Sequence, residues 1–134
     1  QGLQIVKPPY GRVTAIDMNS GDHLWMIANA DTPDNIKNHR LLEGIDIPRT
    51  GIPTRAGVLL TKELLFIAEG TGGVGASPIF RAVDKATGEI IAEIDLPANQ
   101  GGIPFTYEAD GKQYVAMFVT SGSSAAELVA YALP

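Results

Sequence analysis

Residues 15–25 are Ala15-Ile16-Asp17-Met18-Asn19-Ser20-Gly21-Asp22-His23-Leu24-Trp25 (AIDMNSGDHLW), and their pattern returns twice along the chain. Residues 82–92, AVDKATGEIIA, repeat A-x-D-x-x-x-G-x-x-x-W with Ala92 in place of the tryptophan, and residues 129–132, VAYA, form a truncated third copy. In each unit we expect a strand to end at the aspartate, whose carboxylate accepts hydrogen bonds from backbone amides of the turn. The glycine then permits a positive φ, and a second strand leaves antiparallel to the first.

Further strands are predicted between these units. Residues 57–61 and 64–68 form one hairpin around a two-residue turn, and residues 104–107 and 113–119 form another. Four antiparallel strands recurring every 40–50 residues are typical of a β-propeller blade. We therefore predict an all-β fold, a partial β-propeller of antiparallel four-stranded blades. Its parts are a half blade (1–28), an insertion (29–52), a complete blade (53–96) and three strands of a closing blade (97–134).

The insertion at residues 29–52 separates the first two repeats. Thr32-Pro33-Asp34 followed by the apolar Ile36, Leu41 and Leu42, with Gly44 at the end, predicts one short capped helix there. Its acidic residues lack the spacing of a calcium-binding loop, so we interpret them as a solvated face.

Composition excludes several classes of function. The chain has 134 residues, 45% of them hydrophobic and 19% charged, which is typical of one globular domain. A net charge of −5 without a basic patch argues against a nucleic-acid partner. Because there is no cysteine, a disulfide framework and thiol catalysis are excluded. The sequence shows no signal-peptide pattern, as expected of a mature or excised chain, and no apolar run of about 20 residues.

The glycine loop at residues 70–75, GTGGVG, fits G-x-G-x-x-G. In a dinucleotide-binding site a helix begins at that loop, because the pyrophosphate sits on the helix N-terminus. Here Pro78 and the alternation of Ile79, Arg81 and Val83 predict a strand instead. We interpret the loop as a connection between two strands and not as a phosphate cradle.

The repeat resembles the tryptophan-docking unit of pyrroloquinoline quinone (PQQ) dehydrogenases, and other landmarks are similar to the C-terminal end of their membrane glucose, polyol and quinate branch. These landmarks are Pro8-Pro9-Tyr10-Gly11, Gly51-Ile52-Pro53-Thr54, Arg81-Ala82-Val83-Asp84, Leu96-Pro97, Pro104-Phe105-Thr106-Tyr107, Gly111-Lys112-Gln113-Tyr114-Val115 and Ala130-Tyr131-Ala132-Leu133-Pro134. The resemblance covers nearly the whole chain. It implies an eight-bladed propeller of which this chain holds about two blades.

The resemblance also implies an activity for the parent protein. PQQ, bound with calcium on the propeller axis, would oxidise sugars, polyols or related alcohols in the periplasm and pass electrons to a quinone acceptor. The catalytic Asp and the calcium ligands would belong to earlier blades, so we expect no catalytic residue and no metal ligand here. This chain would add a cofactor-facing rim, made of the loop at 70–75 and of Thr54, Arg55, Ala56, Gln100, Gly101, Ser121, Gly122 and Ser123. Relatives carry Trp or Leu at the Arg55 position.

Each feature also has a structural interpretation. Trp25 is expected to wedge between blades, Asp17 and Asp84 to hold turns, and the two histidines to lie on the surface. Arg55 would meet an anionic cofactor or substrate, or form a structural salt bridge. The alternative function is a non-catalytic propeller scaffold. In either case the partners would be the remaining blades, or a second copy of the chain, because open strand edges favour self-association.

Overall fold

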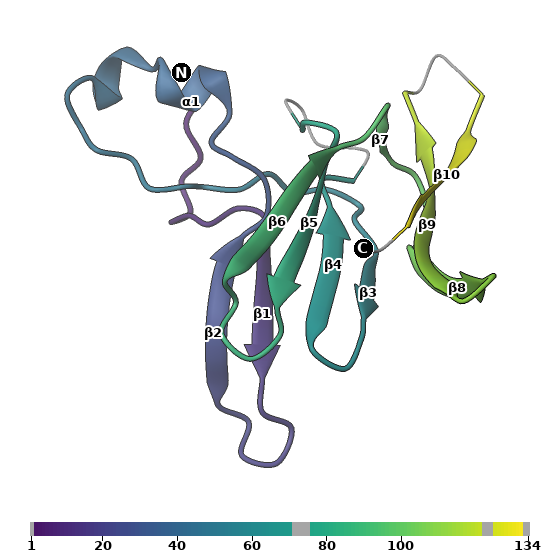
Figure 1. Cartoon of the computed structure of the whole chain (residues 1–134). Coiled ribbons are helices and arrows are strands. Elements are labelled where there is room, and N and C mark those ends of the chain that lie inside the picture. Colours follow the sequence, from purple (N-terminus) through teal and green to yellow (C-terminus); the bar gives the residue numbers. More distant parts are fainter. Residues whose placement is uncertain (1, 71–75, 122–124, 133–134) are drawn as a thin grey trace.

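The computed structural model describes residues 2–70, 76–121 and 125–132, and these are mostly antiparallel strands (Figure 1). The strands are β1 (Arg12–Ile16), β2 (His23–Ala28), β3 (Val58–Leu60), β4 (Leu64–Ala68), β5 (Ile79–Asp84), β6 (Ile90–Asp95), β7 (Asn99–Gln100), β8 (Phe105–Ala109), β9 (Lys112–Thr120) and β10 (Glu127–Ala132). Helical structure among the described residues is limited to α1 (Asp34–Lys37) and the single 3-10 turn η1 (Arg40–Leu42).

The strands form three sheets. β1 pairs with β2 in the first sheet, and the second sheet has the order β3-β4-β5-β6. In the third sheet β10 pairs with β9, whose other edge carries both β7 and β8. This arrangement confirms the all-β, partial-propeller fold, and both predicted hairpins are present as β3–β4 and β8–β9. β7 was not predicted, because two polar residues carry no alternating pattern.

Both complete repeats build the predicted turn in the same way. Asp17 Oδ1 accepts hydrogen bonds from the backbone N–H groups two and three residues further on, at 2.7 and 3.2 Å. Asp84 Oδ1 accepts the same pair, at 2.9 and 2.8 Å. Gly21 and Gly88 take the positive φ values of 80° and 79° that the turn requires. The aspartates are therefore turn residues, as predicted.

The insertion lies beyond one end of β1 and β2 (Figure 1). Its helix α1 is only four residues long and begins after Pro33, as predicted, but no side chain caps it. The Thr32 hydroxyl instead accepts a hydrogen bond from the N–H of Thr50 at 3.0 Å. Thr32 thus ties the two arms of the insertion together.

Two apolar clusters hold the three sheets against one another. One face of the second sheet contacts the first sheet, through Leu65, Ile67 and Val83 against Val13, Trp25 and Ile27. The opposite face contacts the third sheet, through Phe66, Ala68 and Phe80 against Val115, Met117 and Val119. Because successive side chains of a strand point to opposite faces, one four-stranded sheet serves both interfaces.

Trp25 lies between the first two sheets, as predicted. Its indole Nε1 donates a hydrogen bond to the backbone oxygen of Lys85 at 3.0 Å. The ring covers Gly88, where an added Cβ would come within 2.8 Å of the indole Cδ2. The docking contact therefore requires a glycine in the neighbouring repeat.

Candidate functional site

Three of the predicted rim loops meet around the side chain of Gln100, which is fully buried. Its amide Nε2 donates to the backbone oxygens of Gly57 at 2.9 Å and Gly102 at 2.6 Å. Its Oε1 accepts from the N–H of Ala68 at 3.0 Å, and its backbone bridges to Gly70. Gln100 therefore holds the loops before β3, after β4 and after β7 in fixed relative positions.

Asn99 and Glu69 hold the base of the loop between β4 and β5. The Asn99 Nδ2 donates to the backbone oxygen of Glu69 at 3.1 Å and to that of Ala76 at 3.5 Å. The Glu69 Oε2 accepts from the N–H of Ser77 at 2.6 Å. Both ends of this loop are thus fastened by the buried Glu69 and the half-buried Asn99, whereas residues 71–75, which carry most of the glycine motif, lie outside the described residues.

A buried ion pair supports this loop base. Arg81 Nη2 contacts Glu69 Oε1 at 2.7 Å, and each side chain is only 2% exposed. Arg81 Nε also donates to Glu93 at the surface, and Glu93 lies 3.7 Å from Arg49. Two positive and two negative groups therefore balance, so this cluster offers no net charge to a ligand.

The rim residues predicted from the sequence differ in accessibility. Arg55, Gly101 and Ser121 are exposed, Thr54 and Ala56 are half-buried, and Gln100 is buried. Gly70 packs so closely on the 55–56 backbone that a Cβ there would lie 2.5 Å from the Ala56 nitrogen. Ser121 follows β9, whose Thr120 is paired with Asn99. Gly122 and Ser123 lie outside the described residues.

Arg55 supplies the positive charge of the gathered loops. The carboxylates whose pKa departs from its usual value belong to turns and to the insertion. Backbone amides lower the pKa of Asp17, and the Thr87 backbone amide lowers that of Asp84. A hydrogen bond from Lys37, at 2.7 Å, lowers the pKa of Asp31 in the insertion. Across the described ranges, no group of three or more acidic or histidine side chains gathers in a way that would hold a metal ion.

Sheets stacked face to face, docked through a tryptophan on a glycine, with loops gathered at one end, define a propeller-type protein. Residues 1–115 match the family model described as "Glucose/ethanol/alcohol dehydrogenase, beta-propeller domain", a PQQ family. The chain belongs to this family.

Curated relatives agree with this family. The chain is 34% identical over 145 residues to the glycerol dehydrogenase large subunit of Gluconobacter thailandicus, covering 99% of this chain and 18% of that protein. It is 32% identical to the probable quinate dehydrogenase (quinone) of Xanthomonas campestris pv. juglandis, covering 99% and 17% respectively. It is 29% identical to the quinoprotein glucose dehydrogenase of Gluconobacter oxydans, covering 95% and 16%. The chain thus spans less than a fifth of the length of these relatives.

The residues of the gathered loops suit contact with the edge of an anionic planar quinone, but they do not enclose its rings. Arg55 is an exposed cation, and the exposed backbone at Gly101 and hydroxyl of Ser121 add polar contacts. The buried amide of Gln100 is fully used within the protein. No aromatic ring stands in the described loop residues 53–57, 99–103 and 120–121. These residues also do not fit calcium, since none of them is a carboxylate, and Glu69, at the base of the loop after β4, is already paired with Arg81.

Sequence reasoning found the loops but missed what holds them. It chose Gln100 as a ligand and did not single out Asn99, Glu69 or the role of Arg81. Two signals were available: Arg81 stands between apolar neighbours in a buried strand, and Glu69 immediately precedes the glycine loop. Charged residues at buried strand positions are nearly always paired, so each predicted a partner.

None of the described helices is long and apolar enough to cross a membrane.

Proposed function

We propose that this chain is the C-terminal sector of a PQQ-dependent dehydrogenase that oxidises sugars, polyols or related alcohols. The observation that carries the proposal is the gathering of the loops before β3, after β4 and after β7 around Gln100, with the cationic Arg55 exposed among them. The names of the relatives support the substrate class, because they include glycerol, glucose and quinate dehydrogenases.

In this proposal the chain contributes to binding and not to the chemical step. A bound PQQ would supply the two-electron redox chemistry between the alcohol and a quinone acceptor. Arg55 would contact a carboxylate of the cofactor or substrate, and Thr54, Ala56, Gly101 and Ser121 would line the rim beside it, together with Gly122 and Ser123. Gln100 would act as a positioning residue, because its hydrogen bonds hold the loops that carry these groups.

The parent protein would supply what this sector lacks. Calcium ligands and the catalytic carboxylate would come from other blades, and those blades would be the partners of this chain. We place the parent in the periplasm, by analogy with its family. Alone, the chain would be inactive and would self-associate through its open strand edges.

A titration with PQQ tests the proposal, with and without calcium, while light scattering reports molar mass. We expect saturable binding that Arg55→Gln weakens by about tenfold, corresponding to roughly 1.4 kcal/mol. Arg40→Gln, which removes an exposed arginine from the insertion, is the matched control and should bind like the unmodified chain. Gln100→Leu should weaken binding while the strand content measured by circular dichroism is retained.

The opposite result would identify the alternative function. A folded chain that binds no PQQ, or binds it equally well with Arg55→Gln, would be an architectural propeller module. Its interactions would then be made by sheet faces and edges alone.

A further inference from the structure

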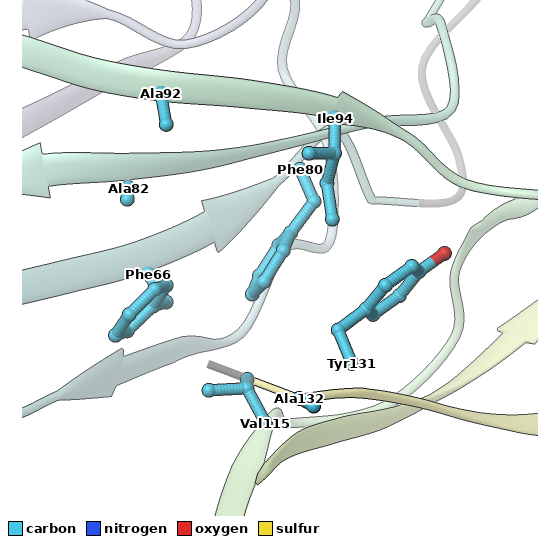
Figure 2. Close-up of a pocket in the computed structure, with 8 residues that line it drawn as sticks. All are labelled: Phe66, Phe80, Ala82, Ala92, Ile94, Val115, Tyr131 and Ala132. Atoms are coloured by element: carbon cyan, nitrogen blue, oxygen red, sulfur yellow. The ribbon is translucent and has the colours of Figure 1, made fainter. Parts of the chain in front are cut away.

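An apolar groove opens between the second and third sheets. It has a volume of about 280 Å³. Figure 2 shows its walls: β4, β5 and β6 contribute one side and β9 and β10 the other. The lining residues are Phe66, Phe80, Ala82, Ala92, Ile94, Val115, Tyr131 and Ala132, none of which is charged.

The repeat explains why space remains here. In the first sheet Ala15 of β1 lies opposite Trp25 of β2, and in the second sheet Ala82 of β5 lies opposite Ala92 of β6. In both sheets the strand register shifts directly after this pair, at Ile16 in β1 and at Val83 in β5. Ala92 is therefore the structural equivalent of Trp25, and its methyl group replaces an indole.

The equivalent space between the first two sheets is filled by that indole. Trp25 packs there against the buried cluster of Leu65, Ile67 and Val83 and covers Gly88. On the other side of the second sheet, the wall facing Ala92 is made by Tyr131, which corresponds to Val83 in the repeat. Tyr131 lies beside Phe80 and Ile94 and leaves the groove next to Ala92 open (Figure 2).

We propose that this groove is a binding site for a flat, uncharged aromatic molecule of about the size of indole. Between the first two sheets an indole already packs at this register, over Gly88 of the neighbouring repeat. The groove is open to solvent, since Ala92, Ile94 and Ala132 are exposed, and its apolar walls offer a ligand dispersion contacts and burial of apolar surface. The rings of Phe66 and Phe80, whose centroids are 5.7 Å apart, supply an aromatic wall for the ligand.

Indole itself is the probe, titrated into the full chain and followed by ligand-observed NMR and calorimetry. We expect saturable binding with a dissociation constant of about 1 mM or tighter, a usual value for so small a ligand. Amide shifts should move at Phe80, Ile94 and Tyr131 and not in the insertion. Indole-3-acetate should bind at least about tenfold more weakly, because the groove contains no cation to pair with a carboxylate.

Two variants test the repeat equivalence directly. Ala92→Trp places an indole in the groove from within and should weaken binding by about tenfold or more. Ala86→Trp, at an exposed position of the β5–β6 turn, is the matched control and should leave binding unchanged. Trp25→Ala should create a second equivalent site and double the number of indole molecules bound.

The proposal is overturned if indole produces no saturable shifts in the unmodified chain. It is equally overturned if Ala92→Trp binds indole like the unmodified chain, or if the shifts map away from the groove. Since shift mapping uses the unmodified chain, it stays decisive even where a variant fails to fold.

Discussion

The two interfaces of the second sheet are built on the same strand pairing but from different side chains. At the interface with the first sheet, Trp25 fills the space near the β5–β6 turn, and the Glu69–Arg81 ion pair is buried nearer the rim loops. Toward the third sheet, Ala92 leaves a groove, and valines stand at the positions equivalent to Glu69 and Arg81. Those two residues are Val119 and Val129.

This difference shows how freely a stacked sheet distributes its large and charged residues. Pairing and pleat decide which positions face the neighbouring sheet, but not which side chain fills them. At the first interface the large aromatic side chain is Trp25 of β2, whereas at the second interface it is Tyr131 of β10. The charged pair is placed only where Glu69 also holds the base of a rim loop. We infer that both interfaces combine stacking with loop support, but by different means. The buried Glu69–Arg81 ion pair supports the loop base at one interface, and the neutral amides of β7 hold the same loop at the other.

Breaking the ion pair should have the largest effect. Arg81→Met leaves Glu69 charged and buried, and we expect the free energy of unfolding to fall by about 3–5 kcal/mol in denaturant titrations. The double variant Glu69→Val, Arg81→Val copies the other interface and should recover most of this loss. Lys37→Met, which breaks an exposed pair with Asp31, should lower the free energy of unfolding far less. A single-variant loss as small as that of the control would contradict the comparison.

Removing the docking tryptophan should come next. Trp25→Ala should lower the free energy of unfolding by about 3 kcal/mol, because it opens a cavity and loses the hydrogen bond to Lys85. Ala92→Trp should raise it by about 1 kcal/mol, by filling the corresponding groove. Thermal or chemical denaturation measures both. If both substitutions leave the free energy of unfolding nearly unchanged, the side chain at this repeat position does not contribute to stability.

A pair of glycine variants isolates the contact with the indole. Gly21 and Gly88 have nearly the same φ, but only at Gly88 would an added Cβ meet the Trp25 ring. Gly21→Ala should cost about 1 kcal/mol from the positive φ alone. Gly88→Ala should cost about 1–3 kcal/mol more through overpacking. If both variants lose the same free energy of unfolding in denaturant titrations, the contact between Trp25 and Gly88 does not restrict the side chain at position 88.

The smallest effect should be on acid stability, where the two turns behave alike. The folded-state pKa values of Asp17 and Asp84 lie below their usual value of 3.8 because both carboxylates accept backbone N–H bonds. Their contribution to stability is present above that unfolded value and is lost as the pH falls through the folded pKa values. The Asp17→Asn, Asp84→Asn variant should therefore depend less on pH than the unmodified chain between about pH 5 and about pH 2. Urea denaturation at several pH values measures this slope, and an unchanged slope would show that the turns do not contribute.

Much of the fold could be predicted because its signals are local. The turns at Asp17 and Asp84 depend on atoms two and three residues apart, and the hairpin β3–β4 on alternation within about ten residues. The gathering of the rim could not be predicted in the same way. The side chain of Gln100 bonds to backbone 32 and 43 residues earlier, and no local pattern encodes such a pairing.

By itself the sequence determined the repeat, the antiparallel hairpins and the family, since each rests on residue order and short-range backbone geometry. Only the tertiary structure decided that Gln100 is a buried support and that Glu69 pairs with Arg81. It also decided that the missing indole at Ala92 leaves a groove. The reason is physical: burial, charge pairing and empty volume arise where distant strands meet, and they depend on which side chains happen to face each other there.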